Sequence, residues 1–173
     1  MFQRRNKLFI FLFITLSASL SSVYALPSDK NKPIHITADS AHLDKSTGIS
    51  VFQGHVVLTQ GTNVVNSNKL TLYSDKNNHL LKAVATGGNP TYQTITDPKK
   101  PPFTATGQTI EYLPPENKII LIGNAKAVQG PNSYAAPQIE YRIDKEMVIS
   151  APSKTGRTMI VIAPQSFQHP SKE

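Results

Sequence analysis

Apolar and polar side chains alternate with a period of two from residue 34 onward. Ile34 and Ile36 alternate with His35 and Thr37, as the two faces of a half-buried strand require. Comparable runs follow at 50–59, 69–73, 80–86, 103–113, 118–128, 138–143, 147–151 and 158–163. No stretch sustains the spacing of an amphipathic helix, so the pattern predicts an all-β chain.

Turn-forming residues separate these runs. They cluster at 46–48, 60–63, 74–78, 114–117 and 143–146. Gly, Asn, Asp and Pro in such positions are typical of hairpins, so consecutive strands should pair antiparallel. The alternation changes phase between Ala38 and Ala41, and again between Val51 and Phe52. Both changes predict bulges where a sheet curves.

The chain also resembles itself at an offset of 69 residues. The coincidences are Gly54 with Gly123, Val56 with Ala125, Leu58 with Ala127, Gln60-Gly61 with Gln129-Gly130, and Leu70 with Ile139. Upstream, Thr37-Ala38 matches Thr104-Ala105 and Leu43 matches Ile110 at an offset of 67, which predicts a turn two residues longer in the second copy. Repeated units of this kind share one core. We therefore expect a rolled, two-layered antiparallel sandwich with an internal repeat.

Several positions on the predicted inward face carry small side chains. They are Ala38, Ala41, Ala83, Ala85, Ala105, Ala125 and Ala127. A packed sandwich usually has bulkier facing residues. Two interpretations remain open: an apolar interior that its own side chains do not fill, or two layers that approach closely at the alanines.

The N-terminal residues have the pattern of an export signal. Basic residues precede an apolar stretch at 8–20, and Val23-Tyr24-Ala25 places suitable residues before a cleavage site. We expect cleavage after Ala25, a single domain at 26–164, and a polar, disordered tail at 165–173. A retained membrane anchor is the alternative, but the apolar run is short for a span.

Charge and composition narrow the function further. The 173-residue chain carries a net charge of +7, and removing the three basic residues of the signal leaves 7 − 3 = +4. This mild charge argues against a nucleic-acid partner. The chain has no cysteine, which excludes disulfides, thiolate zinc sites and iron–sulfur clusters.

No catalytic motif or cofactor-binding motif appears in the sequence. His35, His42 and His55 could approach one another across neighbouring strands, but solvated surface positions are the simpler interpretation because an acidic second shell is missing. The sequence therefore predicts neither a metal nor a cofactor.

Glu111 and Glu140 are the only other candidates for an enzyme, as a carboxylate pair on repeat-related strands. Each has a tyrosine neighbour, Tyr112 and Tyr141 respectively. Strand alternation favours glutamates outside and tyrosines inside.

A set of short motifs occurs in a fixed order along the chain. They are residues 33–39, Gly48, 52–56 (Phe-Gln-Gly-His-Val), Gln60-Gly61, 87–90, 122–125, 154–157 and 160–164. Together they resemble the LptA-type periplasmic lipopolysaccharide-transport proteins, which are built on the OstA-like domain. The resemblance covers about residues 33–164.

The resemblance implies an open β-jellyroll whose apolar interior receives the acyl chains of lipopolysaccharide, with no reaction catalysed. It also implies head-to-tail self-association, and partners that are an LptC-like inner-membrane component and an LptD-like outer-membrane component. Free strand edges would allow such joining. By alternation, the candidate lining residues are Ile34, Ile36, Leu43, Phe52, Val56, Leu58, Leu72, Tyr112, Leu121, Ile139 and Tyr141.

Two features depart from the family pattern. Pro114-Pro115 should make one hairpin stiffer and longer, and Pro137 fits only an edge or a bulge.

Three alternatives remain: a membrane-anchored LptC-like component, a periplasmic glycan-binding or glycan-cleaving β-sandwich, and a structural filament protein. The glycan alternative is weakened by the absence of tryptophan.

Overall fold

The computed structural model describes residues 29–150 and 156–164. The expected signal (1–25) and tail (165–173) lie outside the described residues. The strands are β1 (Ile34–Thr37), β2 (Ser40–Asp44), β3 (Ile49–Gln60), β4 (Asn63–Ser74), β5 (Leu80–Thr86), β6 (Thr91–Thr94), β7 (Phe103–Thr106), β8 (Thr109–Leu113), β9 (Lys118–Gln129), β10 (Asn132–Arg142), β11 (Met147–Ile149) and β12 (Met159–Val161). Three short 3-10 helices accompany them: η1 (Asp29–Asn31), η2 (Pro114–Glu116) and η3 (Ile143–Lys145).

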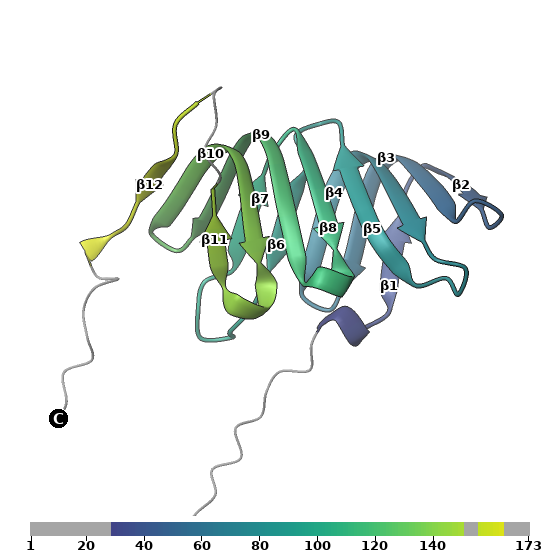
Figure 1. Cartoon of the computed structure of the whole chain (residues 1–173), viewed down its shortest axis with the longest axis horizontal. Helices are drawn as coiled ribbons and strands as arrows, with labels where there is room; N and C mark the ends of the chain where they lie inside the picture. The colour runs from purple at the N-terminus through teal and green to yellow at the C-terminus, as the bar shows by residue number, and fades with distance from the viewer. Residues whose placement is uncertain (1–28, 151–155, 165–173) are drawn as a thin grey trace, which may run out of the picture.

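The strands form one antiparallel sheet that folds over into two layers (Figure 1). The long strands β3, β4, β9 and β10 run through both layers. Layer 1 has the order β2-β3-β4-β5-β8-β9-β10-β11. Layer 2 has the order β1-β3-β4-β6-β7-β9-β10-β12. This arrangement confirms the predicted two-layered β-jellyroll.

The long strands bend where they pass from one layer to the other. The β3–β4 register shifts between Gln53 and Val56, and β9–β10 shifts between Ala136 and Gln138. Gly54 and Gly123 have φ of 79° and 76° at these bends, values that glycine adopts without strain. The bends close one long side of the roll, which we call the seam.

Two of the predicted irregularities occur, and one is displaced. The phase change after Ala38 is the break between β1 and β2, and Pro137 lies at the β10 bulge, as expected. The bulge predicted between Val51 and Phe52 was wrong by a few residues, because the strand bends at Gly54 and His55 instead. Positive φ is cheapest at glycine, so the glycine fixes the bend.

The repeat holds a constant offset of 69 residues, since β1, β2, β3 and β4 begin at 34, 40, 49 and 63, and β7, β8, β9 and β10 at 103, 109, 118 and 132. The predicted offset of 67 was therefore wrong, and Leu43 corresponds to Tyr112 rather than Ile110. The turns 45–48 and 114–117 have equal length. Pro114-Pro115 shapes its turn as a 3-10 helix without lengthening it.

The repeated Gln-Gly pair has a clear structural role. The side-chain amide of Gln60 donates to the Lys32 carbonyl at 3.2 Å, and that of Gln129 donates to the Pro101 carbonyl at 3.4 Å. Each bond fixes the segment that leads into the first strand of its repeat. The following glycine then turns the chain with a positive φ.

The core lies between the layers. Its buried apolar residues are Val56, Leu58, Val65, Leu70, Ala83, Ala85, Tyr92, Phe103, Ala105, Ile110, Tyr112, Ile119, Leu121, Ala125, Ala127, Ala136, Ile139 and Tyr141. Ala83 pairs with Tyr112, and Ala85 pairs with Ile110. Small side chains beside large ones fill the space between neighbouring strands, which argues against an unfilled interior at these two positions.

Candidate functional site

The two layers enclose an apolar interior that is closed along the seam. On the opposite side, the turns of layer 1 (45–48, 75–79, 114–117, 143–146) face those of layer 2 (61–62, 95–102, 130–131). We call this side the mouth. Contacts join the layers there: the Tyr112 hydroxyl donates to Gln60 Oε1 at 2.7 Å, and Lys100 Nζ lies 2.6 Å from Glu146 Oε2.

The structure separates the predicted lining residues into three groups. Those buried in the interior are Val56, Leu58, Tyr112, Leu121, Ile139 and Tyr141. Those only partly buried, in the first repeat, are Ile34, Ile36, Phe52 and Leu72. Leu43 is 62% exposed at the N-terminal end of the roll. Burial does not distinguish a lining residue from a core residue, so their role as lipid contacts remains a prediction.

Two cavities flank the packed centre. At the C-terminal end, a cavity of about 200 Å³ is lined by Tyr134, Ala135, Ala136, Ile139, Val148, Ser150, Thr158 and Ile160. At the mouth of the first repeat, a cavity of about 340 Å³ is lined by Lys32, Ile34, Gln60, His79, Leu80 and Pro114. An apolar cavity of about 150 Å³ holds a benzene molecule. Each cavity is therefore large enough for a short hydrocarbon segment.

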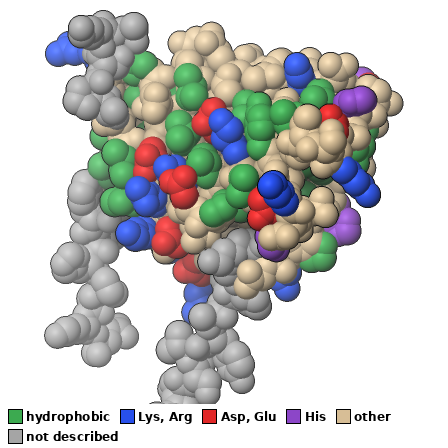
Figure 2. Space-filling view, turned by 45° about the vertical axis from the view of Figure 1, so that its right-hand side comes forward, with side chains coloured by type: hydrophobic (Ala, Val, Ile, Leu, Met, Phe, Trp, Pro, Cys, Tyr) green, Lys and Arg blue, Asp and Glu red, His purple; other side chains and the backbone are tan. Residues whose placement is uncertain are grey.

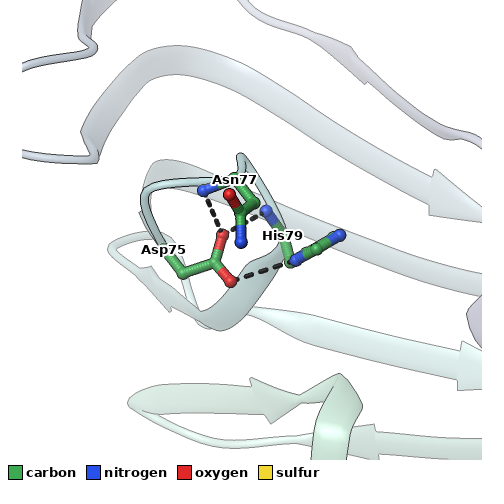
Figure 3. A network of polar contacts seen from close by, with 3 residues as sticks. All are labelled: Asp75, Asn77 and His79. Carbon is green, nitrogen blue, oxygen red and sulfur yellow. Dashed lines mark hydrogen bonds and ion pairs between the residues drawn. The ribbon is translucent and has the colours of Figure 1, made fainter.

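A local hydrogen-bond network holds the rim of the cavity at the mouth of the first repeat (Figure 3). Asp75 Oδ1 accepts the backbone N–H groups of Asn77 and His79 at 2.8 Å, and Asp75 Oδ2 lies 3.0 Å from His79 Nδ1. The bonds from His79 lower the pKa of Asp75. The network fixes the β4–β5 turn and places His79 beside the apolar Leu80.

Buried tyrosines contribute polar groups to the interior. The Tyr92 hydroxyl donates to Asn63 Oδ1 at 2.6 Å. Burial raises the pKa of Tyr112 and of Tyr141 to about 12, and that of Tyr92 well above its usual value. All three phenols therefore stay neutral at physiological pH, and the interior carries no phenolate charge.

The candidate carboxylate pair lies outside the interior. Glu111 lies 3.5 Å from Lys82, and Glu140 lies 2.6 Å from Arg142. Their neighbours Tyr112 and Tyr141 are buried. The predicted orientation, glutamates outside and tyrosines inside, is confirmed.

The candidate histidines are exposed on β1, on β2 and at the β3 bend, and His55 Nδ1 lies 2.8 Å from Asp39. Across 29–150 and 156–164, no three His, Asp or Glu side chains are placed to hold a metal ion. Nor does that part of the chain contain a helix long and apolar enough to cross a membrane.

Both ends of the roll expose apolar strands. Met159, Ile160 and Val161 of β12 are 68%, 54% and 53% exposed. Within 29–150 and 156–164, β12 pairs only with β10, while β1 and β2 at the other end pair only with β3 (Figure 1). Figure 2, with the N-terminal end turned forward, also shows hydrophobic side chains between the charged ones. Free, apolar strand edges favour pairing with another chain.

Comparison with known proteins places this fold in a family. Residues 35–147 match the family described as "LptA/(LptD N-terminal domain) LPS transport protein". The lipopolysaccharide export system protein LptH of Pseudomonas aeruginosa is 35% identical over 143 residues, which covers 83% of this chain and 82% of LptH. LptA of Escherichia coli K12 is 26% identical over 168 residues, covering 95% and 90%.

The structural comparison agrees. The crystal structure of P. aeruginosa LptH, described as the LptA-homologous periplasmic component of the lipopolysaccharide transport device, superposes with a TM-score of 0.74 at 34% identity, covering 80% of this chain and all of that one. These relatives favour the transport interpretation over the glycan-binding and purely structural alternatives. The chain belongs to the LptA/(LptD N-terminal domain) family of lipopolysaccharide transport proteins.

Proposed function

We propose that this chain carries lipopolysaccharide across the periplasm after export by a signal cleaved behind Ala25. The observation that carries the proposal is the apolar interior between the layers, with one cavity at its C-terminal end and one at the mouth of the first repeat. Burying an acyl chain there gains about 0.8 kcal/mol per CH₂. Transport of this kind needs no catalytic residue and no cofactor. Its relatives LptH and LptA are named as lipopolysaccharide export proteins.

Photo-crosslinking tests the interior path. A photoreactive residue placed singly at Ile36, Phe52 or Tyr112 should form adducts with purified lipopolysaccharide, because these side chains lie on the inner faces of the layers. The outward-facing Thr37 and Glu111 are the controls and should give at least about tenfold less adduct, since an acyl chain gains little at a solvated position. Equal yields at inner and outer positions, in folded protein, would refute the proposal.

We further propose that copies join end to end through their free edges, and that the joint reproduces the one between the two repeats. Within the chain, β6 pairs with β7, with Tyr92 opposite Ala105. Shifting this pair by the repeat of 69 residues places Val161 of one copy opposite Ile36 of the next. Related domains of LptC-like and LptD-like components would use the same two edges.

Cysteine pairs can test this register, since the native chain has no cysteine. Mixing V161C and I36C variants should give a disulfide-linked dimer under oxidising conditions, because facing residues of a ladder bring their Cβ atoms within bonding range. The control pairs V161C with I34C, two residues out of register. Comparable dimer yields from both pairs would contradict the predicted joint.

A further inference from the structure

The two repeats differ where the interior meets the mouth. Phe103 and Tyr141 of the second repeat correspond to Ile34 and Leu72 of the first at the 69-residue offset. The two aromatic rings stack with centroids 3.8 Å apart and an angle of 9° between their planes, and both residues are 1% exposed. Phe103 lies on β7 in layer 2, while Tyr141 lies on the part of β10 that belongs to layer 1. The stack therefore spans the space between the layers.

An ion pair crosses the mouth in the same repeat. Lys100, in the 95–102 loop of layer 2, lies 2.6 Å from Glu146, in the 143–146 turn of layer 1. The hydrogen bond from Lys100 lowers the pKa of Glu146, so the pair stays charged at neutral pH. The corresponding residues of the first repeat are Asn31 and Asn77, which carry no charge. The sequence thus supplies this charged pair to one repeat and not to the other.

The first repeat has a cavity beside Ile34, the counterpart of Phe103. The space of about 340 Å³ at its mouth is lined by Ile34 and Leu80, and Ile34 stands in the position that Phe103 occupies in the second repeat. The C-terminal cavity lies on the other side of the stack, between β10 and the last two strands. The packed aromatic pair is part of the buried core that lies between the two cavities.

We propose that the second repeat contains a gate, formed by the Phe103–Tyr141 stack beneath the Lys100–Glu146 ion pair, which separates the two cavities and opens when acyl chains pass. The gate rests on the proposed function, because it supposes that acyl chains occupy the interior. The stacking geometry adds little beyond the burial of the two rings, and one partly exposed ion pair is weak. Their contacts can therefore be broken by a lipid that replaces them with apolar contacts of its own.

The test joins the two sides of the gate chemically. In a K100C/E146C variant, a reducible bis-methanethiosulfonate links the loop to the turn. A second site carries a photoreactive aromatic residue in place of Phe52, on the near side, or Tyr134, on the far side. Purified lipopolysaccharide is the probe. The control link joins V128C to S133C, which are neighbours within layer 2.

With the gate linked, adducts at Phe52 should persist, while adducts at Tyr134 should fall at least about fivefold and return when the link is reduced. The control link should change neither yield. Unchanged adducts at Tyr134 under the K100C/E146C link would overturn the gate, because lipid would then reach the far cavity while the linked gate cannot open. Absence of adducts at both sites without any link would instead count against the proposed function.

Discussion

Replacing Gly54 with alanine should lower the free energy of unfolding by about 3 kcal/mol. Gly54 has a φ of 79° at the bend of β3, a region that costs an L-residue about 1–2 kcal/mol. An added Cβ would also lie 2.8 Å from the Cβ of Asp39. The Cβ of Asp39 is rooted in the backbone, which is tied to the bend because the Asp39 N–H donates to the Gly54 carbonyl at 2.9 Å. Urea unfolding of the full chain measures the loss.

Gly130→Ala is the matched control. Gly130 also has a positive φ, of 57°, but its added Cβ would meet only the Pro101 side chain, at 3.2 Å. Gly130→Ala should therefore lower the free energy of unfolding by about 1 kcal/mol, which is the cost of the positive φ alone. A double variant that adds Asp39→Gly to Gly54→Ala should recover part of the difference, as a double-mutant cycle would show. Equal losses in the two alanine variants would mean that the close approach at the bend is not the cause.

Regular alternation predicted most of the strands and failed where polar residues are buried. The first halves of β4 and β10 were not predicted, and neither was β6 (Thr91–Thr94). The reason is visible at Asn63, which is 2% exposed and donates to the Gln60 carbonyl at 3.1 Å while accepting from Tyr92. A satisfied buried amide costs little. The alternation pattern assigns a buried amide of this kind to the surface, so the strand that contains it is not predicted.

The repeat was recognised in the sequence, but its register near the N-terminus was not. The offset of 67 aligned Thr37 with Thr104, a match of residue type, whereas the backbone aligns Thr37 with Thr106. With the wrong offset, Ile34 and Phe103 were not recognised as equivalent positions of the two repeats. Phe103 was therefore not predicted as a candidate residue. Hydrogen bonds at the bends, such as that from the Gln108 N–H to the Gly123 carbonyl at 2.9 Å, hold the register that side-chain type alone leaves ambiguous.

Alternation also places a residue on a face without saying how deep it lies. Leu43 and Leu121 were both predicted to line the interior, and both stand at inward positions of layer 1. Leu121 is 0% exposed between neighbouring strands, whereas Leu43 is 62% exposed because β2 is the last strand at its end. Depth depends on how many strands flank a residue, which is a property of the topology.

The difference in burial between Leu121 and Leu43 predicts the second large effect on the free energy of unfolding. Leu121→Ala should lower the free energy of unfolding by about 3 kcal/mol, since it removes buried methyl groups and leaves a cavity in a core that cannot collapse around it. Leu43→Ala should change it by less than about 0.5 kcal/mol, as exposed substitutions do. Urea unfolding at low protein concentration measures both. Similar losses would contradict the placement of Leu43 at a free edge.

Comparing Leu43→Ala with Leu121→Ala at different protein concentrations also tests end-to-end assembly. If copies join end to end, Leu43 becomes covered by the C-terminal edge of the preceding copy, and Leu43→Ala then removes a contact that exists only in the assembled state. Association stabilises the folded chain by mass action, so the difference between wild type and Leu43→Ala should grow with protein concentration. The loss from Leu121→Ala should stay constant, because that side chain is buried within one copy. A Leu43→Ala effect that is independent of concentration would argue against joining at this edge.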